Sequence, residues 1–382
     1  MDLELSEEQK AIRLRVRELM EKEFAPLAEE IDETQTYPQA LRDLLAEHEL
    51  FGVPLPQEYG GLDASLLTMS IVMEEVARVC ATTSMVLGAQ YLGSTPLLVA
   101  GSQEQKDRYF SDIAAGRSYV SFSLTEPNAG SDAAGIETRA TREGNEYVLN
   151  GIKCFCTGGD VAQVYCVFAK TTNRETDKED VTAFVVERPT PGFSVGKIEQ
   201  KMGIRASGTA ELILDNVRLP LANRIGREGG GFKIAMQTLE RTRPTTGAQA
   251  VGVAQGALDA AVAFTAGEMK SGRLSGARQD IQFLLADMEA EVQAARWLVY
   301  VASAKVDAGA PDKAIFSASS KLIATEMAIR VIANAAQILC GHGNLRNHPV
   351  ERMMRDAKIF KIVEGTNEIQ RLVIARELLG RW

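Results

Sequence analysis

The sequence is poor in the residue types that build many metal and catalytic sites. It has only three His among 382 residues, so we expect neither a His-based metal site nor a Ser–His–Asp triad. Basic residues are in the minority, with 42 Lys and Arg against 51 Asp and Glu and a formal charge of −9. This balance argues against a nucleic-acid binder, although local basic clusters still allow an anionic ligand.

Cysteine is also sparse, and its pattern does not indicate a disulfide scaffold. There are five Cys in this long chain, and an odd number does not suit a disulfide framework. Cys154 and Cys156 would share one face of a strand, as a metal or redox pair does. The alternative is two small buried side chains, and we favour it because nothing nearby completes a ligand set. No metal site is predicted.

Neither a secretory signal nor a long apolar run is visible in the sequence. The first residues contain no basic start and no apolar stretch. No stretch approaches the roughly 20 apolar residues of a membrane span. We therefore expect a soluble protein without membrane insertion, in a reducing compartment, and predict a cytoplasmic location.

The N-terminal third has the pattern of a helical domain. Ser6 followed by Gln9 fits a capping box, and Ile12, Val16 and Leu19 come after it at helical spacing. Further helices are expected at roughly 38–49, 65–80 and 103–115.

The pattern changes to strands near residue 118. Asn150-Gly151, between two runs of β-forming residues, predicts a hairpin turn.

Helical spacing returns at about Gly231, with one face of a long helix marked by Ile281, Leu284 and Met288. Ala- and Gly-rich stretches at 247–264 suit close helix packing, and 313–338 is expected to be another long helix.

This layout predicts an α+β chain that is mostly α and has three parts. The length, about twice that of a usual domain, agrees with two or three packed units. We expect an N-terminal all-α domain, a middle β domain and a C-terminal helical bundle over residues 1–117, 118–228 and 229–382, respectively.

Three segments carry candidate chemistry, each with an ordinary structural alternative. Residues 124–132 place hydroxyl and small side chains around a Pro and a Gly, which suits a polar or anionic ligand or a simple turn. Glu240 and Arg243 are spaced to point the same way at a helix start, or they are a solvated helix end. Glu364 follows two apolar β-branched residues, which favours a raised carboxyl pKa and a base; otherwise it is a Glu in a first helical turn.

Together these segments resemble one family, the acyl-CoA dehydrogenases. Residues 124–132 resemble its first signature, and 350–358 running into 364–371 resemble its C-terminal one. Residues 201–207 and 231–236 match between them, and the resemblance extends from about 4 to 380. It implies a β-barrel-like middle domain, a C-terminal four-helix bundle, bound FAD, usually a homotetramer, and transfer of electrons to an electron-transfer flavoprotein.

The resemblance also implies a role for individual residues. Glu364 matches the base that takes the α-proton of an acyl-CoA thioester while the β-hydride goes to flavin N5. The implied cofactor-binding residues are Phe122, Leu124, Thr125, Phe155 and Thr157 beside the flavin ring, Gln279, then Gln337, Cys340 and Gly341 normally across a subunit interface, and Thr366 and Glu368 after the base. The implied substrate-binding residues are Ser131, Glu240, Arg243 and Gly365. Some relatives, such as the isovaleryl and long-chain enzymes, carry the base at the position of Thr242, so this chain resembles the short- and medium-chain arrangement.

Several positions depart from the family pattern around the cofactor and acyl pocket. Glu268 stands where an Arg is usual, and a carboxylate there would repel the FAD diphosphate unless Arg273 or Arg278 compensates. His342 replaces a Tyr in the loop expected to face the FAD phosphates. These changes keep two alternatives open, a non-oxidative acyl-CoA-processing relative and an FAD-poor subunit of a hetero-oligomer.

The acyl group is only weakly constrained by the sequence. Residues 80–95, which would line the acyl pocket, contain no Arg that could bind a second carboxylate. This absence disfavours a glutaryl-type substrate. Val363 stands where a Tyr is usual, and the smaller side chain leaves room for a branched or cyclic acyl group.

Overall fold

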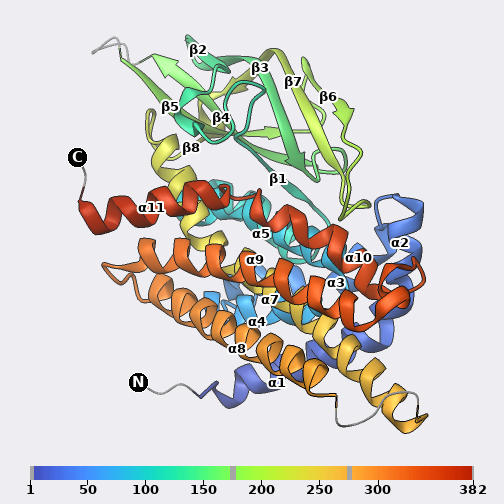
Figure 1. Ribbon diagram of the computed structural model, residues 1–382. Helices are drawn as coiled ribbons and strands as arrows, with labels where there is room; N and C mark the ends of the chain where they lie inside the picture. The colour runs from blue at the N-terminus through green and yellow to red at the C-terminus, as the bar shows by residue number, and fades with distance from the viewer. Residues whose placement is uncertain (1–3, 173–177, 273–277, 381–382) are drawn as a thin grey trace.

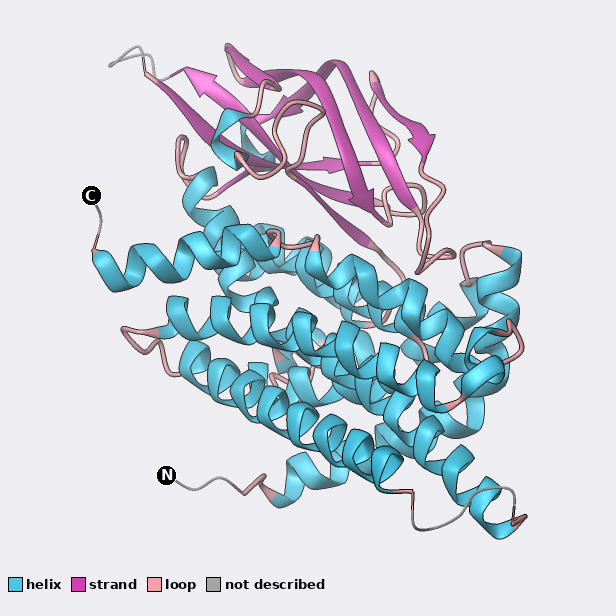
Figure 2. Ribbon diagram, in the orientation of Figure 1, coloured by secondary structure: helices cyan, strands magenta, loops and turns pink. Residues whose placement is uncertain are grey.

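The computed structural model describes residues 4–172, 178–272 and 278–380. Figure 1 shows a β sheet on one side of a broad layer of helices, and Figure 2 shows the same separation by element type. Along the chain, helices are followed by strands and then by helices. The expected α+β, mostly α fold class is confirmed, whereas the domain boundaries themselves stay a prediction.

The N-terminal part is helical and starts with the expected cap. Its helices are α1 (Glu7–Leu19), α2 (Ala28–Thr34), α3 (Gln39–Glu47), α4 (Leu66–Val79), α5 (Ala81–Ala100) and α6 (Gln103–Ala114). The capping box is confirmed, because Ser6 Oγ accepts from Gln9 N and Gln9 Oε1 accepts from Ser6 N. The sequence did not predict α5. This helix is buried on nearly all sides and includes Pro96, so it lacks the one-sided apolar period of a surface helix.

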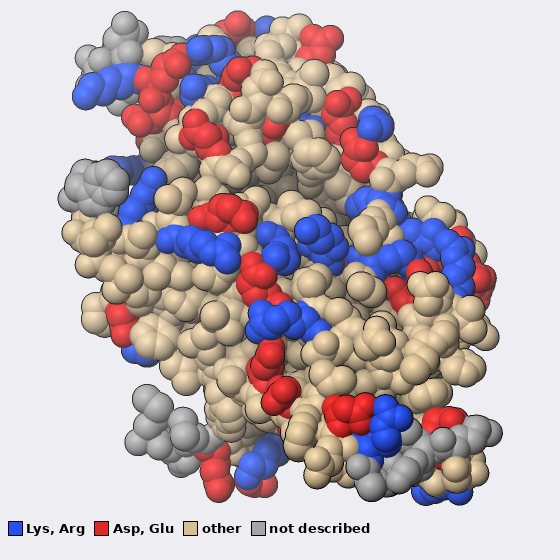
Figure 3. Space-filling view, in the orientation of Figure 1, with Lys and Arg blue, Asp and Glu red and all other residues tan. Residues whose placement is uncertain are grey.

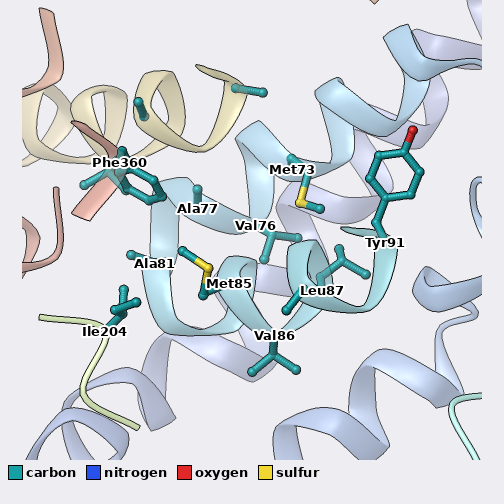
Figure 4. Close-up of a cluster of buried hydrophobic side chains, with 14 of the residues drawn as sticks. Met73, Val76, Ala77, Ala81, Met85, Val86, Leu87, Tyr91, Ile204 and Phe360 are labelled. Carbon is teal, nitrogen blue, oxygen red and sulfur yellow. The ribbon is translucent and has the colours of Figure 1, made fainter. Parts of the chain in front are cut away.

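Buried side chains of α4 and α5 form the centre of the helical core. Figure 4 shows Met73 and Val76 of α4 gathered with Met85 and Leu87 of α5. Ile204 joins the same cluster from the segment between the last long strands, and its N–H donates to Asp356 Oδ1 at 2.5 Å. The β domain is therefore anchored in the helical core through this segment.

The middle part is one eight-stranded sheet in the order β6-β7-β3-β2-β4-β5-β8, with β1 paired to β4. Its strands are β1 (Val120–Ser123), β2 (Arg139–Glu143), β3 (Glu146–Thr157), β4 (Val164–Thr172), β5 (Glu179–Glu187), β6 (Phe193–Ile198), β7 (Thr209–Pro220) and β8 (Arg224–Ile225). The predicted hairpin turn at Asn150-Gly151 is wrong, because β3 runs through both residues and pairs with β7. A Cβ at Gly151 would lie 2.3 Å from Thr138 Oγ1, so this glycine serves a close approach rather than a turn.

The C-terminal part consists of three long helices and two shorter ones. They are α7 (Gly231–Lys270), α8 (Gln279–Asp307), α9 (Lys313–Ile338), α10 (Pro349–Ala357) and α11 (Asn367–Leu379). The expected apolar face of α8 is confirmed, with Met288 buried and Ile281 and Leu284 packed against the core. Close packing of the Gly-rich stretch is confirmed as well: Cβ atoms at Gly252 and Gly256 would lie 2.1 and 2.2 Å from backbone oxygens of α4.

Helix α7 corrects the expectation that no stretch of the chain is long and apolar enough to span a membrane. By length and composition it contains a window that would suffice to cross a membrane. However, 56% of that window is buried, and α7 packs against α4, α8 and α9. Its apolar composition is therefore explained by its place at the centre of the bundle.

The same helix continues through Pro244, which moves Glu240 and Arg243 from the expected helix start to the interior of α7. A proline cannot donate to the carbonyl four residues before it, which here belongs to Glu240. That carbonyl instead accepts from Ser317 Oγ of α9 at 2.8 Å. The neighbouring helix thus satisfies the group that Pro244 leaves open.

Candidate active site

Glu364 lies in a turn just before α11, with its backbone in the left-handed region. Its φ is 55°, and that of Gly365 is 88°. Thr366 caps α11 by accepting from Ile369 N at 3.4 Å, so Glu364 precedes the helix and is not part of its first turn. Two successive left-handed residues bend the chain sharply, and glycine suits the second position because it has no Cβ.

The Glu364 side chain is partly exposed as a whole, but one oxygen of its carboxyl group is buried. Its Oε2 atom is shielded from solvent and has no hydrogen-bond partner among the described residues. Burial raises the pKa of Glu364 to about 7, while the hydroxyls of Thr242 and Thr246 and the cations of Lys321 and Arg243 oppose this rise. A carboxylate of this kind is a stronger base than an exposed one and ionises near neutral pH.

Helix α7 supplies one wall of this site. Thr242 and Thr246 lie one helical turn apart, and the Thr242 hydroxyl also lacks a hydrogen-bond partner among the described residues. Arg243 is only 6% exposed, and burial lowers its pKa while Glu364 and Glu240 raise it. Glu240 itself pairs with Lys313 Nζ at 2.7 Å. The positive charge of Arg243 therefore lies in the same buried region as the Glu364 carboxyl.

A second group of predicted residues comes together at the edge of the β domain that carries β1. The segment containing Leu124 and Thr125 is held against β3, since Cys154 N donates to Thr125 O at 2.9 Å. Ser121 Oγ of β1 donates to the carbonyl of Thr157 on β3 at 2.9 Å. The structure thus brings Phe122, Leu124, Thr125, Phe155 and Thr157 into one region.

Phe155 stands out within this second group. It lies where the register of β3 and β7 shifts, has a φ of 54°, and exposes 62% of its surface. An exposed aromatic ring on a bulge offers a flat apolar face to a ligand.

A buried ion pair supports this region from inside. Lys153 Nζ donates to Glu126 Oε1 at 2.5 Å and to Leu124 O at 3.1 Å. The same Glu126 accepts from the backbone N–H groups of Thr138 and Glu137. Farther along the loop, Ser131 is exposed to solvent.

The remaining cofactor candidates lie elsewhere in this chain. Gln279, Gln337, Cys340 and Gly341 are all exposed. Their end of the bundle is marked by Phe264, whose ring lies 5.7 Å from that of His342. The span of α7 from Thr246 to Phe264 is about 27 Å at 1.5 Å per residue, so one subunit does not join these residues to Glu364.

Glu268, predicted to repel the FAD diphosphate, and Thr366 and Glu368, predicted to contact the flavin, all lie at helix ends. Glu268 lies in the last turn of α7, near the segment with Arg278, and Arg273 lies outside the described residues. Arg278 is exposed and pairs with Asp280. Thr366 and Glu368 lie at the N-terminus of α11, beside the base turn, with Glu368 exposed to solvent.

Sequence reasoning missed three residues that surround the base turn: Thr246, Lys321 and Gln370. Lys321 is fully buried on α9, and Gln370 is fully buried on α11. The signal for Lys321 was a lone charged residue on the buried face of α9, one turn after Ser317. A charge at such a position is rare unless it has a partner.

Comparisons with known proteins identify the family. The N-terminal, middle and C-terminal domains of acyl-CoA dehydrogenase match residues 6–117, 121–217 and 229–379, respectively. The chain belongs to the acyl-CoA dehydrogenase family and is an oxidoreductase of that class; members of the family are flavoproteins that use FAD.

Individual relatives match over almost their whole length. The chain is 44% identical to a probable acyl-CoA dehydrogenase of Mycobacterium leprae, covering 98% of this chain and 96% of the relative. It is 43% identical to the cyclohex-1-ene-1-carbonyl-CoA dehydrogenase of Geobacter metallireducens, covering 98% and 99%. A chain from a solved structure described as the electron transferring flavoprotein of Acidaminococcus fermentans, in work on flavin-based electron bifurcation, superposes with a TM-score of 0.95 at 41% identity, with 100% of both chains covered.

Proposed function

We propose that this protein catalyses the FAD-dependent α,β-dehydrogenation of an acyl-CoA thioester, with Glu364 as the base that removes the α-proton. The observation that carries the proposal is the buried Glu364 carboxyl, which has a pKa of about 7 and an unpartnered Oε2 atom. The α-proton of a thioester is a very weak acid, so its removal needs a desolvated carboxylate. The surroundings of Glu364 meet that need.

The enolate formed by proton removal also needs a hydrogen-bond donor. The N–H of Glu364 donates no hydrogen bond to any described residue, so it is available to the thioester oxygen. A donor of this kind typically contributes about 3 kcal/mol to transition-state stabilisation. When bound, FAD supplies the acceptor for the β-hydride, and the protein supplies position and electrostatics.

The residues present fit a flavin at the edge of the β domain. Phe155 offers an exposed aromatic face, and Thr125 and Thr157 lie on the backbone segments held together beside it. Because Gln279, Gln337, Cys340 and Gly341 lie at the end of the bundle marked by Phe264, about 27 Å along α7 from Thr246, we propose that they contact the FAD of a neighbouring subunit in a homotetramer. An electron-transfer flavoprotein is the proposed acceptor of the electrons.

The surface also suits an anionic ligand despite the negative net charge. Figure 3 shows Lys and Arg side chains in a band across the region where α10 and α11 lie in Figure 1. Basic residues of that segment are Arg352, Arg355, Lys358, Lys361, Arg371 and Arg376. A phosphate-bearing ligand such as CoA would be attracted to such a band.

Activity is expected to depend on one ionisation near neutral pH. Burial raises the pKa of Glu364 to about 7, so the active carboxylate is lost as the pH falls through about 7 rather than through 4.5. The logarithm of kcat/KM should therefore rise by about one unit per pH unit below 7 and level off above it. A steady-state series over pH, with saturating electron acceptor, tests this, and a flat profile between about pH 5.5 and 8 would contradict it.

A visible spectrum of the purified protein tests the proposed function as a whole. We expect bound flavin whose visible absorption bleaches when a suitable acyl-CoA is added anaerobically. Bound flavin that no acyl-CoA bleaches would favour the non-oxidative alternative, and protein without flavin would favour the FAD-poor subunit. The titration should include straight, branched and cyclic acyl-CoAs, because Val363 is small and one relative is named for a cyclic substrate.

A further inference from the structure

The turn that carries Glu364 is held by side chains from two helices. Lys321 Nζ of α9 donates to Gly365 O at 2.9 Å and to Asn367 Oδ1 at 3.0 Å. Gln370 Nε2 of α11 donates to Gly365 O at 2.8 Å and to Glu364 O at 3.2 Å. Both carbonyls of the left-handed turn therefore point inward to buried donors.

The amide of Asn367 ties this arrangement to α9. Its Nδ2 atom donates to Thr325 Oγ1 at 3.0 Å and to Glu326 Oε1 at 3.1 Å. Asn367 is 1% exposed, and Lys321 and Gln370 are fully buried. Nothing in proton abstraction itself uses these groups, yet they converge on the two residues whose backbone directs the carboxyl.

A buried lysine is a costly way to satisfy two neutral oxygens. An ammonium group loses its hydration on burial, and a neutral donor would make the same hydrogen bonds more cheaply. What a lysine adds is a positive charge close to the Glu364 carboxyl. The charge favours the ionised carboxylate, which is the form that accepts a proton.

We propose that Lys321 is a positioning residue for proton abstraction, which holds the left-handed Glu364–Gly365 turn in place and keeps a cation beside the carboxyl. This inference rests on the proposed function of Glu364. Gln370 shares the first role but not the second, because its amide carries no charge.

Besides Lys321, Arg243 from α7 and Tyr91 from α5 interact electrostatically with the same carboxyl. Glu240 from α7 interacts with Arg243, and Glu326 from α9 and Glu368 from α11 interact with Lys321. Burial lowers the pKa of Lys321 to about 7, with Glu364 raising it and Arg243 lowering it, so the cation is present below about pH 7, where the carboxyl begins to ionise. Arg243 remains when Lys321 is replaced, so the carboxyl would lose one of its two nearby cations.

Two variants separate the roles. Lys321→Met removes the donor and the charge, whereas Gln370→Met removes a donor only. For Lys321→Met we expect kcat to fall by at least about 10-fold and the pH at half-maximal kcat/KM to rise by about one unit. For Gln370→Met we expect a lower kcat at an unchanged pH midpoint. Lys305→Met, which breaks the partly exposed pair with Asp312, is the matched control and should change neither.

The carboxyl can also be followed without turnover. Infrared titration of its protonated C=O band, assigned by loss of the band in Glu364→Gln, should give a higher midpoint in Lys321→Met than in the wild type. A lower melting temperature with both the pH midpoint and kcat unchanged would overturn the proposal, since a merely structural lysine would behave so. If Lys321→Met does not fold, an unchanged kcat in Gln370→Met, or a shifted pH midpoint in the charge-retaining Lys321→Arg, would overturn it instead. Failure of the wild type to oxidise any acyl-CoA would sink the proposed function, whereas normal turnover in both variants would sink this inference alone.

Discussion

Glu364→Gln is expected to reduce turnover by about 10⁴-fold, the upper end of what a positioned base contributes, while FAD and acyl-CoA still bind. The amide has nearly the shape of the carboxyl, but it cannot accept the α-proton. The nearest side chains from α7, Thr242 and Thr246, are hydroxyls and cannot replace it as bases near neutral pH. Loss of flavin bleaching in stopped-flow mixing, together with retained binding in an equilibrium titration, is the expected result.

The control for this variant is Glu377→Gln, which changes an exposed carboxyl near the other end of α11. It should leave the rate of flavin reduction within about 2-fold of the wild type, because surface substitutions rarely matter. A Glu364→Gln protein that reduces its flavin at a normal rate would show that another group removes the proton. The mechanism proposed above would then be wrong.

The position of Thr242 agrees with what the resemblance implies, a base carried on α7 in some relatives and in the turn before α11 in others. Its hydroxyl lies close enough to Glu364 to lower the pKa of that carboxyl, although they sit 122 positions apart in the sequence. Two backbone positions therefore face one buried space. We therefore expect that a carboxyl carried at this position of α7 would enter the same space.

The fold was largely predictable wherever local patterns and packing agreed. The capping box at Ser6 and the apolar spacing along α8 are local signals, and the structure confirms both. Helix α5 escaped prediction because burial on nearly all sides removes the amphipathic period. The interior position of Glu240 and Arg243 in α7 also escaped prediction, because nothing in the sequence shows that Ser317 satisfies the carbonyl that Pro244 leaves open.

The candidate site was less predictable, because its groups come from distant segments. The motif around Glu364 was visible in the sequence, but the burial that raises its pKa depends on α7 and α9. The pair Asn150-Gly151 shows the same limit in the β domain. Its composition is that of a turn, but it lies inside strand β3, where the close approach of Thr138 requires a glycine. Tertiary contacts decide such positions, and local sequence does not report them.

The buried pair of Lys153 and Glu126 leads to the second large effect. Lys153→Met is expected to lower the free energy of unfolding by about 3–5 kcal/mol, because Glu126 would be left as a buried charge without its cation. The backbone N–H groups of Thr138 and Glu137 still bind that carboxylate, so the expected loss of stability lies toward the lower end of this range. Denaturant unfolding of the holoenzyme gives the measurement.

Two further variants test whether the pair itself is responsible. The double variant Lys153→Met with Glu126→Gln should recover part of the loss, because it leaves no unpaired charge. Lys197→Met breaks an exposed pair with Glu199 and should cost less than about 1 kcal/mol. If Lys153→Met were as stable as Lys197→Met, the pair would not be important for folding. Because Lys153 also holds the carbonyl of Leu124, next to Thr125, the same variant should retain less FAD on purification, which links the stability of β3 to the proposed flavin site.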